Sequence, residues 1–90
     1  MVTVTPRAKQ VLTYLLKERD IPEEKGFRLI PDPLEGFSLL VSNVKPGDQV
    51  IEHDGLMVLL VGADIAQQVD GASVDVYDTM DGPALKFNHR

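Results

Sequence analysis

The candidate ligands for a divalent metal ion in this 90-residue chain are Asp32, Glu35, His53 and His89. Carboxylate oxygens suit hard cations, and imidazole nitrogen suits iron or zinc, so together they could form an iron or divalent-metal site. Each also has an ordinary structural explanation. Carboxylates on a loop are usually solvated, and His89 is next to the last residue of the sequence, where a chain frays. Metal binding through these four residues is therefore our alternative hypothesis.

The region around His53 contains the one place where a histidine adjoins carboxylates in the sequence, between Glu52 and Asp54. A metal would accept these ligands. However, Asp54-Gly55 is also a strong signal for a two-residue type I′ turn between two strands. We therefore predict a hairpin turn here.

No residue pattern indicates catalysis. The candidates are Ser38, Ser42 and Ser73 as nucleophiles, and Glu35 with Glu52 or Asp75 with Asp78 as acid–base pairs. None of the serines lies in a Gly-x-Ser-x-Gly segment, and nothing predicts the burial that would shift a carboxylate pKa. The glycines are isolated turn residues, so no phosphate-binding loop is expected. We predict that the protein is not an enzyme.

The composition excludes further classes of function. The chain has no cysteine, which removes disulfides, thiolate nucleophiles and cysteine-held iron–sulfur clusters. Its net charge of −5 opposes a phosphate backbone, so we expect no nucleic-acid partner. No apolar run approaches the length of a membrane span, and the first residues lack the apolar segment of a signal peptide. We expect one cytoplasmic domain over residues 1–90 with no membrane partner.

The first long element is a helix. Thr5 can cap it, and Pro6 suits its first position, where a missing N–H does no harm. Apolar residues then recur at helical spacing, at Ala8, Val11, Leu12, Leu15 and Leu16. Lys9, Gln10, Thr13 and Lys17 are expected to face water. The helix should end before Pro22.

Two strands follow in the stretch Gly26–Val41, where apolar residues alternate on either side of a segment rich in turn residues. That segment, Ile30–Gly36, contains two prolines and a final glycine, so we expect it to interrupt both strands. A loop of this kind between two strands is where a small domain could present a site.

Apolar segments separated by turn residues predict further short strands in the rest of the chain. They cover Gln49–His53, Leu56–Val61, Ser73–Tyr77 and a last strand through Leu85 and Phe87. A brief helix is expected over Asp64–Val69, with Ile65, Ala66 and Val69 facing inward and Gly71 ending it. With six or seven strands, hairpin-length connections and one long N-terminal helix, the chain is predicted to be an α+β domain with small mixed or antiparallel sheets.

The order of these elements and their turn residues resembles the HesB/IscA family, the A-type iron–sulfur carriers of cluster biogenesis. The resemblance covers nearly the whole chain. It is carried by VTVTPRAKQVL near the start, GFRL at 26–29, EGF at 35–37, EHDG at 52–55, VDGASVDVY at 69–77 and LKFN at 85–88.

The resemblance implies a fold, a tendency to form dimers and partners linked to iron–sulfur metabolism. It also implies three cysteine ligands in family members, one in a Gly-Cys-Ser/Ala-Gly segment and two in a Cys-Gly-Cys tail. Matching Gly36-Phe37 to the end of the first segment puts Leu34 at the cysteine position, in a shorter loop, and the tail is absent. Leucine has no lone pair to offer iron, so we expect no cofactor.

We therefore predict a non-enzymatic, cysteine-free HesB/IscA-like protein with an interaction, accessory or scaffold role related to iron–sulfur metabolism. Its partner would be another protein or a second copy of the chain. The predicted contact surface comprises Pro31, Asp32, Pro33, Leu34, Glu35 and Phe37.

Overall fold

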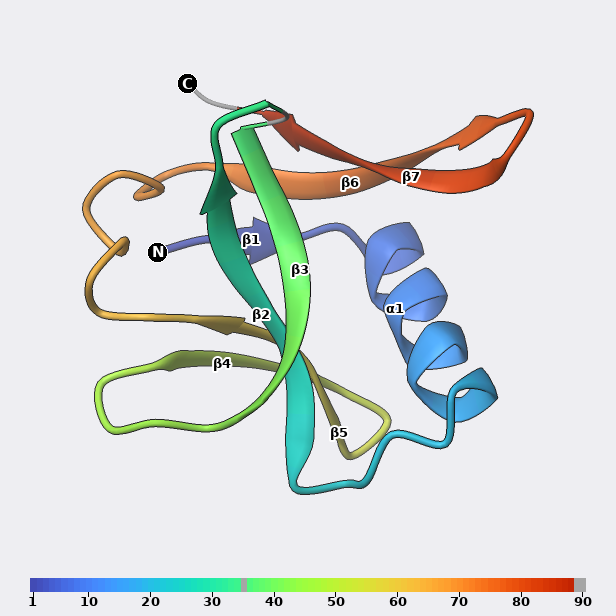
Figure 1. Cartoon of the computed structure of the whole chain (residues 1–90), viewed down its shortest axis with the longest axis horizontal. Helices are drawn as coiled ribbons and strands as arrows, with labels where there is room; N and C mark the ends of the chain where they lie inside the picture. The colour runs from blue at the N-terminus through green and yellow to red at the C-terminus, as the bar shows by residue number, and fades with distance from the viewer. Residues whose placement is uncertain (35, 89–90) are drawn as a thin grey trace.

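The computed structural model describes residues 1–34 and 36–88. These residues form one helix and seven strands, and the strands assemble into two mixed β-sheets (Figure 1). The elements are β1 (Thr3–Val4), α1 (Pro6–Glu18), β2 (Lys25–Asp32), β3 (Gly36–Asn43), β4 (Gln49–His53), β5 (Leu56–Val61), β6 (Ser73–Thr79) and β7 (Gly82–Asn88). This arrangement confirms the predicted α+β class. The described residues contain no helix long and apolar enough to cross a membrane.

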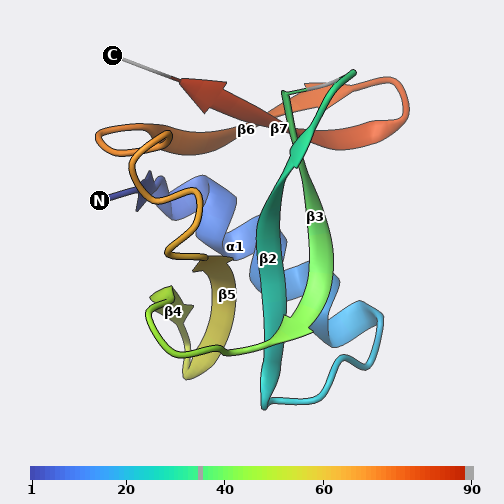
Figure 2. The same ribbon diagram turned by 60° about the vertical axis from the view of Figure 1, so that its left-hand side comes forward.

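The strands form a four-stranded sheet of order β3-β2-β5-β4 and a three-stranded sheet of order β1-β6-β7. Each sheet has one parallel pair, β2 with β5 and β1 with β6, and its hairpins are antiparallel. Figures 1 and 2 show the β6–β7 hairpin running across one end of the β2–β3 hairpin. The two sheets therefore meet where β3 and β7, an edge strand of each, come together.

The entry of α1 follows its sequence signals. The Thr5 hydroxyl accepts a hydrogen bond from the Ala8 N–H (3.2 Å), and Pro6 occupies the first turn. The predicted water-facing position of Thr13 was wrong, because the β4–β5 hairpin lies over that side of the helix and Thr13 is buried. Its hydroxyl donates to the backbone oxygen of Lys9 (2.7 Å), which satisfies it without water.

Apolar side chains from α1, β2, β5 and β6 form a continuous core. Residues 58–61 of β5 are all buried, as expected for a strand covered on both faces. Leu60 is buried outside this core cluster. It pairs in register with Arg28 of β2, so these two residues lie on the other face of the four-stranded sheet.

The prediction that Ile30–Gly36 interrupts both strands was wrong at its two ends. β2 continues to Asp32 and β3 begins at Gly36, with Pro31 opposite Phe37 in the ladder. The parallel pairing of β2 with β5 is centred on Arg28, so β2 has one strand neighbour at Pro31 and a missing N–H there is tolerated.

The predicted short helix over Asp64–Val69 was also wrong, because residues 63–71 form successive turns. Isolated bonds, such as Ile65 N–H to the Gly62 oxygen and Val69 N–H to the Ile65 oxygen (both 3.2 Å), do not form a helical series. Ile65 and Val69 are buried as predicted, whereas Ala66 is exposed.

Candidate functional site

The described part of the β2–β3 hairpin tip presents an apolar side chain to solvent. Asp32 accepts a hydrogen bond from the Leu34 N–H (2.8 Å), which closes the turn from within. The Leu34 side chain is 94% exposed. Glu35 lies outside the described residues.

An aromatic contact holds this hairpin against the second sheet. The rings of Phe37 in β3 and Phe87 in β7 stack with centroids 4.5 Å apart. As a result, the β2–β3 tip lies beside the C-terminal end of β7, although the two segments are far apart in the sequence (Figure 1). Of the predicted contact surface, Pro31, Pro33 and Leu34 are exposed, while Asp32 and Phe37 are partly buried.

The candidate metal ligands do not come together in the described residues. Gly26, at the start of β2, lies against Met57, which is next to the β4–β5 turn that carries His53. Asp32 is six residues further along β2, about 20 Å away at the rise of a strand. Glu35 and His89 lie outside the described residues. Within residues 1–34 and 36–88, no three His, Cys, Asp or Glu side chains are grouped as metal ligands.

His53 ends β4, and Asp54-Gly55 form the hairpin turn after it, as predicted. Asp54 and Gly55 both have positive φ, 53° and 78°, which is the geometry of a type I′ hairpin. The His53 Nε2 lies 3.6 Å from the Asp54 carboxylate. This neighbour contact needs no metal to explain it.

The candidate acid–base groups on β6 each have a structural partner. The Asp75 carboxylate accepts from the Thr5 hydroxyl (2.7 Å) and from the Val76 N–H, and these hydrogen bonds lower the pKa of Asp75. Asp78 pairs with Arg7 at 2.9 Å on the surface. They therefore bind the start of α1 to the sheet, which is a structural role.

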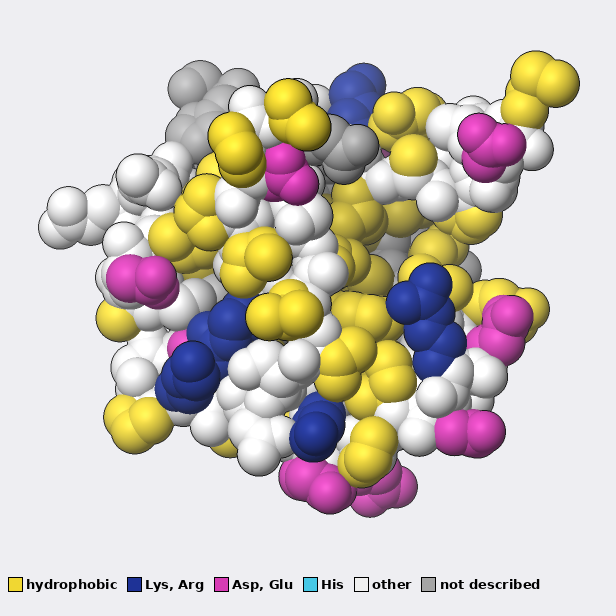
Figure 3. Space-filling view, viewed as in Figure 1, with side chains coloured by type: hydrophobic (Ala, Val, Ile, Leu, Met, Phe, Trp, Pro, Cys, Tyr) yellow, Lys and Arg dark blue, Asp and Glu magenta, His cyan; other side chains and the backbone are white. Residues whose placement is uncertain are grey.

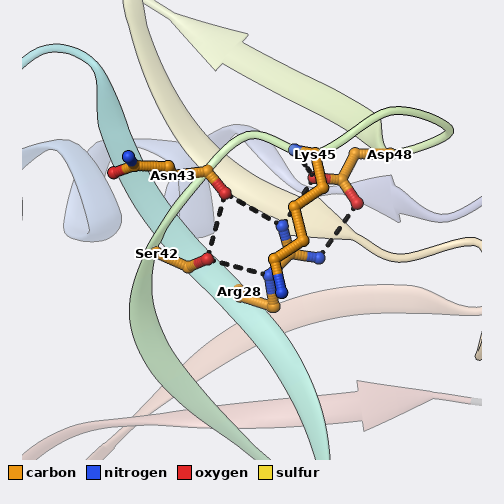
Figure 4. A network of polar contacts seen from close by, with 5 residues as sticks. All are labelled: Arg28, Ser42, Asn43, Lys45 and Asp48. Carbon is orange, nitrogen blue, oxygen red and sulfur yellow. Dashed lines mark hydrogen bonds and ion pairs between the residues drawn. The ribbon is translucent and has the colours of Figure 1, made fainter.

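A buried ion pair that sequence reasoning missed lies on the outer face of the four-stranded sheet (Figure 4). Arg28 donates to both Asp48 oxygens, at 2.9 and 2.6 Å. It also donates to the Ser42 hydroxyl and to the Asn43 carbonyl, each at 3.1 Å. The side chains of Arg28 and Asp48 are 11% and 2% exposed. The alternation of Phe27 and Leu29 puts Arg28 on the other face of the strand, where a charged side chain is expected to face water, so its burial had no clear signal in the sequence.

Hydrogen bonding shifts the pKa of both partners toward the charged form. The bonds from Arg28 lower the pKa of Asp48, outweighing the opposite effect of burial, and the bond from the Lys45 N–H (2.6 Å) adds to this. The bond to Asp48 likewise raises the pKa of Arg28. The two opposite charges neutralise each other, so neither side chain is a reactive acid, base or nucleophile. The pair holds the loop after β3 against the four-stranded sheet.

The sequence matches no family model and no curated protein sequence. Among solved structures it is similar to Escherichia coli SufA, a protein involved in the biosynthesis of iron–sulfur clusters, with 27% identity and a TM-score of 0.73. That match covers 98% of this chain and 84% of SufA.

The chain has the HesB/IscA-like fold. It is also similar to IscA, solved with a [2Fe-2S] cluster, at 23% identity and a TM-score of 0.71, covering 99% of this chain and 85% of IscA. A protein from Aquifex aeolicus, solved in solution by NMR, gives 23% identity, a TM-score of 0.66 and coverage of 99% and 91%.

The side chains of this HesB/IscA-like protein do not fit an iron–sulfur cluster. Cluster iron is held mainly by cysteine thiolates, and the chain has no cysteine. The position that the family resemblance assigns to a ligand holds Leu34, whose side chain has no donor atom. The fold is therefore present without the cysteine thiolates that usually hold cluster iron in proteins.

Proposed function

We propose that this protein is a non-enzymatic, cluster-free HesB/IscA-like protein that acts by binding another protein through the tip of its β2–β3 hairpin. The observation that carries the proposal is the exposure of Leu34 on a hairpin tip held by Asp32 and by the Phe37–Phe87 stack. Covering Leu34 with a partner's pocket would remove apolar surface from water, and the contacts that hold the hairpin reduce the cost of ordering its backbone on binding.

The similarity to SufA supports a role in iron–sulfur metabolism. A protein with the fold of the carriers but without thiol ligands could occupy a carrier's place in a complex without accepting the cluster. The accessory role is thus proposed from the fold and from the exposed Leu34. The absence of cluster carriage is proposed because the chain has no cysteine.

Substitution of Leu34 tests the contact surface. Leu34→Asp should abolish capture of the partner from a cell extract, since it puts a charge into an apolar contact. Its effect on the free energy of unfolding should stay within about 0.5 kcal/mol because the side chain is exposed. Capture is followed by mass spectrometry, and stability by urea denaturation.

Met80→Asp is the matched control, because Met80 is fully exposed at the tip of the other long hairpin, β6–β7. Partner capture should survive this change. Equal capture by the wild type and by Leu34→Asp would refute the proposed surface. Light scattering of both proteins identifies the case in which the partner is a second copy.

Anaerobic reconstitution with ferrous iron and sulfide tests the absence of cluster carriage. We expect the purified protein to stay colourless, because no thiolate is present to hold the cluster. Visible charge-transfer absorption that remains with the protein through gel filtration would contradict this part of the proposal.

A further inference from the structure

A groove of about 780 Å³ lies between the two sheets, on the side of β3 that faces the β6–β7 hairpin. Most of its lining residues have apolar side chains, although more than half of the exposed lining surface is polar. The lining comes from both sheets, and the C-terminal end of α1 borders it. The lining residues are Phe37, Ser38, Leu39, Tyr77, Pro83, Ala84, Leu85 and Arg19. Figure 3 shows hydrophobic side chains gathered in the hollow between β3 and the β6–β7 hairpin, with basic side chains beside it over α1.

Both long walls of the groove are edge strands. β3 has β2 as its one strand neighbour, and β7 has β6. Three consecutive residues of each strand, 37–39 and 83–85, line the groove. Since side chains alternate between the faces of a strand, consecutive lining residues mean that the strand edge, with its backbone, borders the hollow.

The edge of β3 lacks the features that usually protect an exposed strand. Its eight residues, Gly36–Asn43, include no charged side chain and no proline. β7, in contrast, carries Pro83 and Lys86. Unprotected edges accept an added strand, so β3 is the wall that offers backbone hydrogen bonds to an occupant.

The charge of the residues that line the groove indicates which side chains an occupant should carry. Among its described lining residues Arg19 is the one that carries a charge, and no ion pair of Arg19 occurs within residues 1–34 and 36–88. Arg19 thus places a positive charge at this end of the groove, on a chain of net charge −5. It therefore favours an occupant with a carboxylate near the end of α1.

We propose that this groove binds an extended, apolar segment of a partner protein, which adds as a strand to the edge of β3 and places one acidic side chain beside Arg19. The proposal rests on the protein-binding function proposed above and names the kind of segment that is bound. Strand hydrogen bonds and the apolar side chains of the walls would supply affinity, and Arg19 would supply selectivity.

A second copy of this chain fits less well. If β3 paired with β3 of another copy, each groove would receive an uncharged strand and Arg19 would stay without a counter-charge. Self-association through β3 is therefore an outcome that the experiment must detect, and it would overturn the proposal.

Selection from a heptapeptide library displayed on phage, with the purified full chain as bait, tests the inference. We expect the selected peptides to have apolar residues at alternate positions, no internal proline and an Asp or Glu at a constant position. Binding of the synthetic peptides is measured by fluorescence anisotropy. Arg19→Glu and Tyr77→Ser should each weaken it about tenfold, through charge reversal and loss of an aromatic contact.

Matched controls lie on α1, away from the groove. Lys17→Glu reverses a positive charge two residues before Arg19, and Tyr14→Ser removes another exposed tyrosine. Both should leave peptide affinity within about twofold, since neither residue lines the groove. Amide shifts in the NMR spectrum of the complex should centre on residues 37–39.

Three results would overturn the proposal: no selected peptide binds, the peptides bind Arg19→Glu and Tyr77→Ser as they bind the wild type, or the shifts at 37–39 arise from concentration-dependent dimers. Leu34→Asp keeps this result separate from the proposed function, because Leu34 does not line the groove. That variant should still bind the peptides. Failed peptide binding with intact, Leu34-dependent partner capture would remove the groove inference alone.

Discussion

Asp48 shows how one buried carboxylate can stabilise a loop. Its oxygens accept from Arg28 and from the Lys45 backbone, and its side chain is almost fully covered. Asp48→Asn would leave the Arg28 guanidinium buried without a counter-charge. We expect a loss of about 3–5 kcal/mol in the free energy of unfolding at pH 7, measured by urea denaturation.

The same variant should change the response to acid. The pKa of Asp48 is lowered in the folded state, so its stabilising contribution is complete above the unfolded value of about 3.9 and is lost as the pH falls through the folded value. The gap in stability between the wild type and Asp48→Asn should therefore narrow below about pH 4. Asp81→Asn, at an exposed turn, is the control and should track the wild type. A gap that stays constant with pH would exclude this role for Asp48.

At the scale of the element, Thr5 joins α1 to the three-stranded sheet. Its hydroxyl accepts from the Ala8 N–H and donates to Asp75 on β6, so it caps the helix and positions it on the sheet. Thr5→Ala should lower the free energy of unfolding by about 1–2 kcal/mol. Thr5→Ser keeps both hydrogen bonds and should recover most of that loss in thermal or urea unfolding. Equal losses in the two variants would assign the effect to the methyl group instead.

At the scale of the whole molecule, the Phe37–Phe87 stack connects the four-stranded sheet to the three-stranded one. A double-mutant cycle of Phe37→Leu and Phe87→Leu should give a coupling energy of about 0.5–1.5 kcal/mol, the range for aromatic pairs. Urea unfolding of the four proteins measures it. Strict additivity would show that the sheets are held together by other contacts.

The same stack relates the two proposed contact surfaces. The hairpin tip with Leu34 and the groove along β3 share Phe37, which contributes to both. A partner that inserts a strand beside β3 would thus lie next to the exposed Leu34. One partner could therefore use both surfaces, and the variants at Leu34, Arg19 and Tyr77 report on each surface separately.

The sequence by itself determined the local elements and the main exclusions. The Thr5-Pro6 cap, the helical apolar spacing of α1 and the Asp54-Gly55 turn act over a few residues, so their signals are present in the chain. The lack of cysteine likewise excludes thiolate cluster ligands whatever fold the chain adopts.

Only the tertiary structure decided what lies beside what. The Arg28–Asp48 pair, the stack of Phe37 on Phe87 and the groove between β3 and β7 join residues about 20 to 50 positions apart. The extra strand residues at Pro31 and Asp32, and the turns in place of a helix at 63–71, depend on ladder partners and packing. Local propensity contains no information about such contacts, because they form between segments that meet only when the two sheets assemble.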